Sequence, residues 1–167
     1  MKSGGDKGME NKSCLICERI NMIKDQSNPY FVAELETGYV VIGDHQYFKG
    51  YTLFLCKHHE TELHFLEESF KEKFLIEMSK VAEAVYKAFS AEKLNYELLG
   101  NGDSHIHWHL FPRRSGNSPV NGPVWWLDRT LMYSDEVMPC EAELNEMKTK
   151  LFNELEDLVP IVDKGNY

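Results

Sequence analysis

Apolar residues recur along three stretches of the chain at steps of three and four positions, which is the period of an amphipathic helix. The longest stretch covers residues 70–89, with Glu and Lys between the apolar positions, and predicts one long helix that covers a sheet. A short run after Cys14 predicts an N-terminal helix, which Ser27-Asn28-Pro29 ends. Residues 144–158 predict a C-terminal helix, which Pro160 ends.

Runs rich in β-branched and aromatic residues alternate with these helices and predict strands. Five such runs are present, at residues 30–34, 39–42, 51–56, 94–99 and 105–111. The first three read as an antiparallel meander, and Gly100-Asn101-Gly102 marks a tight loop before the last run. Pro112 is expected to end the last strand. The pattern therefore predicts an α+β fold, with a mainly antiparallel sheet, one long covering helix, a short N-terminal helix and a C-terminal helix.

A chain of 167 residues with 43% apolar content can bury one substantial core, so we expect a single domain. Residues 1–12 are too polar to pack and predict a disordered leader. The main domain is expected over residues 13–115, with residues 116–167 forming a loop and a helix packed on it. Core packing is also expected for the run Val124-Trp125-Trp126-Leu127, with a role in substrate choice or in a dimer as the alternative.

The formal net charge of −9 argues against broad binding to a nucleic acid polymer, which depends on many Lys and Arg contacts to phosphates. No apolar run approaches the roughly 18 to 20 residues that span a bilayer, and the first residues lack the apolar core of a signal peptide. We therefore expect a cytoplasmic protein with no membrane association. In that compartment the four cysteines are expected to be thiols or metal ligands.

Three histidines alternate with apolar residues in the last predicted strand, at positions 105, 107 and 109. Because strand side chains alternate between faces, these three rings should project to the same side. Over the strand they spread across about 13 Å, which is too far for all three to bind one metal ion. We therefore expect the three rings to have different tasks.

An imidazole is nucleophilic at neutral pH, and one ring nitrogen can attack phosphorus if a carbonyl holds the proton on the other. His107, the middle ring, is the candidate nucleophile, and a flanking histidine can bond the phosphate oxygens. Gly100-Asn101-Gly102 could let backbone N–H groups approach the same phosphate, although an ordinary hairpin turn explains these residues equally well.

The run from His105 to Phe111 resembles the His-φ-His-φ-His-φ-φ signature of the histidine-triad (HIT) superfamily, where φ is apolar, and Pro112-Arg113 follows it as in many members. The run Gly50-Tyr51-Thr52-Leu53-Phe54-Leu55-Cys56-Lys57-His58-His59 is similar to the family's Gly-His-Thr-Leu-Val-Ile-Pro-Lys-x-His strand. The likeness covers roughly residues 14–113. It implies a HIT-like α+β fold, a HIT-like catalytic domain over residues 13–115 and a homodimer.

The resemblance also implies roles for individual residues. The catalytic residues would be the triad itself, with His107 as the nucleophile, His109 in contact with the phosphate, and His105 beside them. The substrate-binding residues would be Asp44 at the ribose and, at the phosphate, Asn101, Gly102 and Ser104. Ser104 would stand in for a serine that the family carries in a longer loop before the first histidine.

Cys14-Leu15-Ile16-Cys17 is a Cys-x-x-Cys pair, which with two histidines can bind zinc in a tetrahedron. The resemblance implies a structural zinc held by Cys14, Cys17, His59 and His105. His58 could replace His59, because the two are adjacent, and two free cysteines packed in a small core are the alternative to a metal site.

The implied activity is cleavage at the α-phosphate of a dinucleoside polyphosphate or a nucleoside phosphoramidate, through a nucleotidyl-histidine intermediate on His107. The expected ligand is a purine nucleotide or a dinucleoside polyphosphate, and no organic cofactor is expected. The alternatives are a nucleotidyl transferase or phosphorylase, in which phosphate resolves the intermediate, and a nucleotide-binding module without turnover.

Overall fold

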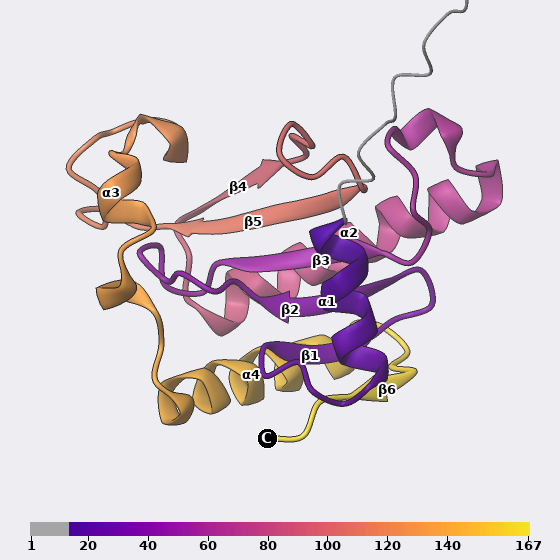
Figure 1. The fold of residues 1–167 in the computed structure, drawn as a ribbon. Helices are drawn as coiled ribbons and strands as arrows, with labels where there is room; N and C mark the ends of the chain where they lie inside the picture. Colours follow the sequence, from indigo (N-terminus) through magenta and orange to yellow (C-terminus); the bar gives the residue numbers. More distant parts are fainter. Residues whose placement is uncertain (1–13) are drawn as a thin grey trace, which may run out of the picture.

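The computed structural model describes residues 14–167, and the leader expected over residues 1–12 lies outside them. Four α-helices are described: α1 (Leu15–Lys24), α2 (Glu68–Ala88), α3 (Arg129–Met132) and α4 (Glu141–Glu156). Single 3₁₀ turns occur at Leu63–Phe65, Val124–Trp126 and Asp135–Val137. Figure 1 follows these elements in chain order.

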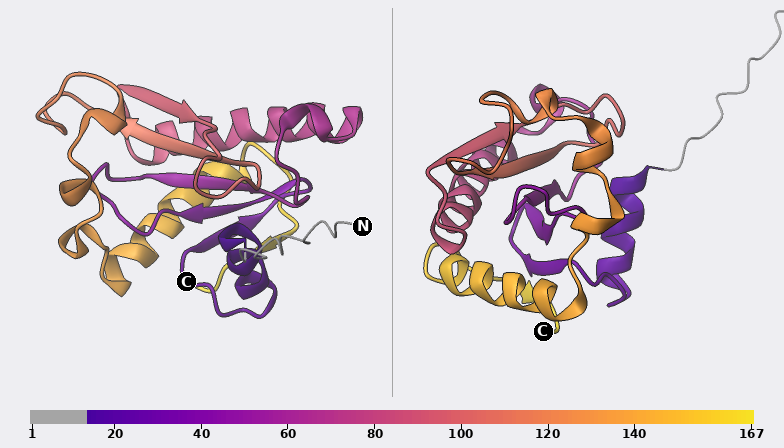
Figure 2. Two further views of the ribbon diagram at one scale, coloured as in Figure 1. Left: turned by 45° about the horizontal axis from the view of Figure 1, so that its top comes forward. Right: turned by 90° about the vertical axis from the view of Figure 1, so that its left-hand side faces the viewer.

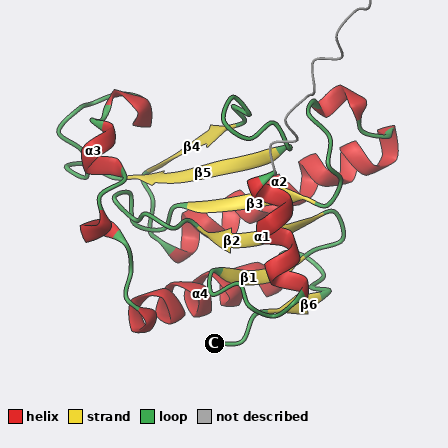
Figure 3. Cartoon of the chain, viewed as in Figure 1, coloured by secondary structure: helices red, strands yellow, loops and turns green. Residues whose placement is uncertain are grey.

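One antiparallel sheet lies at the centre of the molecule (Figure 3). Its strands are β1 (Phe31–Glu34), β2 (Gly38–Ile42), β3 (Thr52–Cys56), β4 (Lys93–Glu97), β5 (His107–Arg113) and β6 (Asp163–Lys164). Their order across the sheet is β4-β5-β3-β2-β1-β6. β1, β2 and β3 form the predicted antiparallel meander. β5 pairs with β3 on one side and with β4 on the other, so the histidine strand lies inside the sheet.

Helices cover both faces of the sheet, as Figure 2 shows. α2 and α4 pack beside each other on one face, where the main core includes the stacked rings of Phe54 and Phe74, with centroids 5.1 Å apart. α1 lies on the opposite face and buries Ile16, Ile20 and Ile23 against side chains of β1, β2 and β3. The predicted covering helix and C-terminal helix are thus confirmed, and the fold is the α+β fold expected from the HIT resemblance.

Glu77 anchors α2 to the turn between β1 and β2. Its buried carboxylate accepts hydrogen bonds from the backbone N–H groups of Glu36 and Thr37, at 3.2 and 2.9 Å, and from the Thr37 hydroxyl. The turn that joins the first two strands is therefore fixed by a side chain from a helix far along the chain.

The histidine strand differs from the prediction at both ends. It begins at His107, so His105 lies in the bend before β5 and does not share the strand's alternation. It continues through Pro112 to Arg113, where Pro112 pairs with Leu94 of β4. β3 pairs with β5 only as far as Leu110, so the missing N–H of Pro112 removes no hydrogen bond to β3.

The expectation that both tryptophans pack in the core is wrong. Val124 and Leu127 are buried in a cluster with Phe48 and Phe111, whereas Trp125 and Trp126 are 59% and 60% exposed. The short elements α3 and β6 were not predicted; β6 completes the sheet by pairing with β1. Within residues 14–167, no helix combines the length and the apolar character that a bilayer crossing demands.

Candidate active site and metal cluster

A pocket of about 250 Å³ opens on the sheet face that α1 covers. α1 forms one wall through Leu15, Ile16 and Arg19, and Tyr133, which follows α3, forms part of the other. His107 and His109 lie in the pocket side by side, with ring centroids 4.6 Å apart and planes at 67°. The sheet thus presents two of the three predicted catalytic rings to one cavity.

The proton of His107 is placed by the backbone. Its Nδ1 lies 2.6 Å from the carbonyl oxygen of His105, which can only accept, so Nδ1 carries the hydrogen. The lone pair of the neutral ring is then on Nε2. This is the tautomer that a nucleophilic imidazole requires.

His109 is held differently. Its Nδ1 lies 2.6 Å from the hydroxyl of Tyr51, which precedes β3. Burial, together with the neighbouring His107, lowers the pKa of His109 to about 4, so this ring is neutral at pH 7. Tyr51 stands where the family's strand pattern has a histidine, and the sequence did not predict that it belongs to the site.

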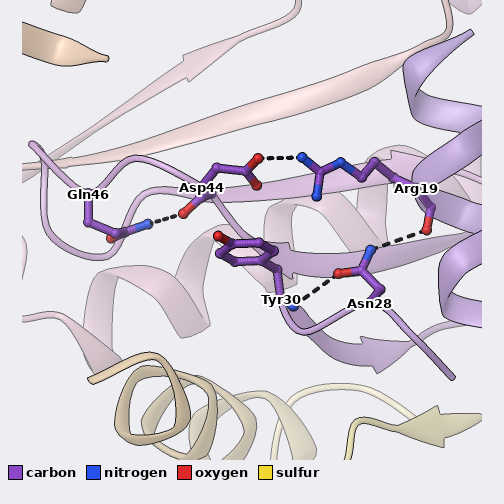
Figure 4. Close-up of polar contacts among 6 residues, drawn as sticks. Arg19, Asn28, Tyr30, Asp44 and Gln46 are labelled. Carbon is purple, nitrogen blue, oxygen red and sulfur yellow. Dashed lines mark hydrogen bonds and ion pairs between the residues drawn. The ribbon is translucent and has the colours of Figure 1, made fainter. Parts of the chain in front are cut away.

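Asp44, the predicted ribose-binding acid, lines the pocket and forms an ion pair with Arg19 of α1 (Figure 4). Asn28 supports this arrangement, since its amide donates to the Arg19 carbonyl at 3.2 Å and accepts from the Tyr30 N–H at 2.9 Å. Gln46 donates to the Gly43 carbonyl at 2.7 Å and so braces the loop that carries Asp44. Asp44 therefore shares the pocket with His107 and His109, and Arg19 is an addition that the sequence did not reveal.

The loop before the first histidine differs from the expectation. Asn101, Gly102 and Ser104 do not line the pocket. Asp103 lines it instead, and its carboxylate accepts a hydrogen bond of 3.3 Å from the Leu15 N–H at the start of α1. Only the position of Asp103, two residues before His105, could have suggested it.

Four side chains converge at the start of α1: Cys14, Cys17, His59 and His105. Their ligand atoms all lie within 4.8 Å of one another. The sulfur to Nδ1 distances are 3.6 Å for Cys14 and His105, 3.4 Å for Cys17 and His105, and 3.1 Å for Cys17 and His59. A tetrahedral zinc ion with ordinary bond lengths separates sulfur and nitrogen ligands by about 3.5 Å, so this geometry fits such an ion.

Of the two adjacent histidines, His59 lies in this cluster. His59 contributes Nδ1 to the cluster, whereas the ring of His58 stacks on Phe70 with centroids 4.1 Å apart. The Nε2 of His105 lies 2.8 Å from the Cys56 carbonyl, which fixes its hydrogen there and leaves Nδ1 free for a metal. The buried His105 ring does not line the pocket, and its Nδ1 lies in the candidate metal cluster instead.

Comparison with known proteins agrees with this geometry. The HIT domain family model matches residues 26–116. A histidine triad protein from Bradyrhizobium japonicum has a similar structure, with a TM-score of 0.66 and 21% identity over 75% of this chain and 89% of that one. A hypothetical histidine triad nucleotide-binding protein from Sulfolobus tokodaii has a TM-score of 0.65 and 18% identity, over 85% and 93% of the two chains.

A zinc-bound histidine triad family protein from Mycobacterium smegmatis is also similar, with a TM-score of 0.60 and 20% identity over 87% of this chain and 95% of that one. No curated protein matches the chain. At these identities the similarity to solved structures supports the fold alone. The evidence for the family is the match between the sequence and the HIT domain family model. Since that match covers more than half of the 167 residues and includes the three histidines, the protein belongs to the HIT-domain, or histidine triad, family.

Proposed function

We propose that the protein is a nucleotide hydrolase that cleaves at the α-phosphate through a nucleotidyl-histidine on His107. The observation that carries the proposal is the 2.6 Å contact between His107 Nδ1 and the His105 carbonyl, which leaves Nε2 as a free lone pair in a ring that lines the pocket. His109 beside it and Asp44 across the pocket supply partners for a phosphate and a ribose.

The reaction has two displacements at one phosphorus atom. In the first, Nε2 of His107 forms a bond to the α-phosphorus, and the bond from phosphorus to the leaving oxygen or nitrogen breaks with its electron pair and takes up a proton. In the second, water forms the new bond to phosphorus and releases a proton, which replaces the one that the leaving group took from solvent; the bond to Nε2 breaks with its electron pair on nitrogen, and the ring returns to its starting state. The product is a nucleoside monophosphate.

The charges around the pocket favour a substrate with few negative charges. Among the described residues that line it, Arg19 is the one Lys or Arg, and it is paired with Asp44. Asp103 adds a second carboxylate. A polyphosphate chain needs more cations than these residues offer, whereas a nucleoside phosphoramidate has a single charged phosphate. Of the two substrate classes expected from the family, the proposal therefore favours the phosphoramidate.

We assign zinc to the cluster of Cys14, Cys17, His59 and His105, with a structural role. The two sulfur and two nitrogen donors suit zinc. The four residues would hold the start of α1 against the bend before β5. Because all four positions are protein ligands, the site has no open position for catalysis.

A homodimer is part of the same proposal. β4 lies at the edge of the sheet, and Tyr96 and Leu99, on it and just beyond it, are 50% and 57% exposed. An exposed edge strand with apolar side chains is suited to contact with a second copy. Sedimentation equilibrium would give twice the chain mass of 19.4 kDa if the expectation holds, and the chain mass itself if it does not.

Trapping the intermediate tests the enzymatic proposal. The protein is mixed with adenosine phosphoramidate or diadenosine tetraphosphate, quenched in alkali, and analysed by mass spectrometry. We expect an adduct of one adenylyl group on the peptide that contains His107, and a kcat/KM at least about tenfold higher for the phosphoramidate. Inorganic phosphate in a parallel reaction separates the alternatives, because a phosphorylase would yield ADP. Binding without adduct or turnover would overturn the proposal and indicate a binding module.

A further inference from the structure

Tyr51 is placed to control the chemistry of His109 although it reaches the site from another segment, just before β3. Its hydroxyl lies 2.6 Å from His109 Nδ1. Its ring stacks on Phe111, with centroids 4.1 Å apart and planes at 5°, and is nearly parallel to the His109 ring, at 10°. The stacking holds the phenol in the plane in which it can hydrogen bond to the imidazole edge.

The direction of this hydrogen bond follows from counting protons. Burial raises the pKa of the Tyr51 hydroxyl well above its ordinary value, so the phenol keeps its proton. Within residues 14–167, the hydroxyl has His109 Nδ1 as its one protein hydrogen-bond partner. If Nδ1 carried the hydrogen, the phenol would have no protein acceptor for its own proton. The favourable arrangement is donation from Tyr51 to Nδ1, which leaves the single proton of neutral His109 on Nε2.

The two neighbouring rings in the pocket therefore have opposite tautomers. The carbonyl of His105 accepts from Nδ1 of His107, so Nε2 of His107 is a lone pair. The phenol of Tyr51 donates to Nδ1 of His109, so Nε2 of His109 is an N–H. One ring presents a nucleophile and the other a hydrogen-bond donor, and a different protein oxygen sets each.

We propose that Tyr51 is a positioning residue that holds His109 as its Nε2–H tautomer, so that this N–H donates to a phosphate oxygen while Nε2 of His107 attacks phosphorus. The catalytic part of this inference rests on the function proposed above, whereas the tautomer does not. Position 51 is a histidine in the family's strand pattern. An imidazole can offer either a donor or an acceptor, but a protonated phenol facing a ring nitrogen donates, and so selects one tautomer.

Side-chain ¹⁵N NMR of the full chain tests the tautomer without any substrate. The ring signals of His109 are assigned by their loss in His109→Gln. In the wild type we expect a protonated Nε2 and an unprotonated Nδ1, and in Tyr51→Phe a mixture of both tautomers. Tyr47→Phe is the matched control, because Tyr47 packs against the same apolar cluster as Tyr51, and it should leave the His109 signals unchanged. A wild-type ring protonated on Nδ1, or the same tautomer in Tyr51→Phe, would overturn the inference.

Kinetics test whether the tautomer is used. With adenosine phosphoramidate, Tyr51→Phe should lower kcat about tenfold to a hundredfold, as expected when a donor to the transition state is misplaced, with a smaller effect on KM. Tyr47→Phe should keep the wild-type kcat. A shifted tautomer with an unchanged kcat would refute the positioning role. If the wild type shows the expected tautomer but no turnover with any substrate, the proposed function fails and the structural assignment of Tyr51 stands.

Discussion

The carbonyl of His105 accepts a hydrogen bond of 2.6 Å from Nδ1 of His107, while the ring of His105 lies in the cluster with Cys14 and Cys17. One residue therefore links the candidate nucleophile to the candidate metal. The side chain that holds the bend before β5 in place also fixes the carbonyl that sets the tautomer of His107. One experiment can test the nucleophile His107, and a separate one can test the candidate metal site.

Replacing His107 with alanine should abolish the adduct and lower turnover at least about a thousandfold, because the variant lacks the ring nitrogen that is proposed to form the bond to phosphorus. Intact-protein mass and steady-state rates measure the two effects. His64→Ala is the matched control, since His64 is an exposed histidine away from the pocket. A His107→Ala protein that kept the wild-type rate would contradict the mechanism, and circular dichroism would confirm that the variant is folded.

Replacing Cys17 with serine should remove the metal and destabilise the fold, because a hydroxyl is a poor zinc ligand. A metal at a thousandfold excess over its Kd contributes about 4 kcal/mol to the free energy of unfolding, and the variant should lose a comparable amount. Elemental analysis should find one zinc per wild-type chain and none in Cys17→Ser. Cys140 is exposed and outside the cluster, so Cys140→Ser should keep its zinc. Zinc retained by Cys17→Ser would exclude this ligand set.

Replacing Glu97 with glutamine should stabilise the protein at neutral pH and leave its stability at about pH 4 unchanged. Burial raises the pKa of Glu97 above its ordinary value, and Arg113 opposes the shift only in part. The folded state therefore binds this proton more tightly than the unfolded state, so the stability that Glu97 contributes falls as pH rises from about 4.5 through the raised pKa. Glutamine does not titrate and avoids this loss.

Thermal unfolding across this pH range measures the effect as the difference between the variant and the wild type. Glu72 lies on α2 and is exposed, so Glu72→Gln should show no such difference. A Glu97→Gln protein that is less stable than the wild type at pH 7 would mean that the carboxylate has a favourable partner in solution.

Replacing Glu77 with alanine should lower the free energy of unfolding by about 2–4 kcal/mol, because it leaves the buried Thr37 without an acceptor for its N–H and its hydroxyl. Urea denaturation measures the loss. Glu72→Ala changes the same residue type on the exposed side of α2 and should stay within about 0.5 kcal/mol of the wild type. Equal losses in the two variants would show that the contact to Thr37 is not responsible, because alanine itself favours the helix.

The long helices were predictable because the period of their apolar residues extends over several helical turns. The apolar period indicated a helix over residues 70–89, and α2 runs from Glu68 to Ala88. The extra residues at its start depend on Glu67, whose side chain accepts from the Phe70 N–H, and no apolar spacing reveals such a cap. The two residues of β6 and the four of α3 are too short to show any period.

The site was predictable only at positions that the histidine motif or the family's sequence pattern fixes directly. His107, His109 and Asp44 lie in the pocket as expected, since the motif and the family pattern gave their positions directly. Tyr51 reaches the site from the segment just before β3 and Arg19 from α1, so their contacts depend on strand register and on packing, which are not visible in a single sequence. Ser104 and Asp103 are neighbours, and only the conformation of the bend decides which of them lines the pocket.

α1 is both a wall of the pocket and the helix that begins at the metal cluster. If the cluster holds zinc as proposed, a chelator in the purification buffer would release the start of this helix and withdraw Leu15 and Ile16 from the pocket wall, while His107 and His109 stayed on their strand. Such a preparation would have a raised KM and also a lowered kcat, because the bend that carries the His105 carbonyl would lose its anchor as well. Assays of this protein should therefore be compared only at a stated zinc content.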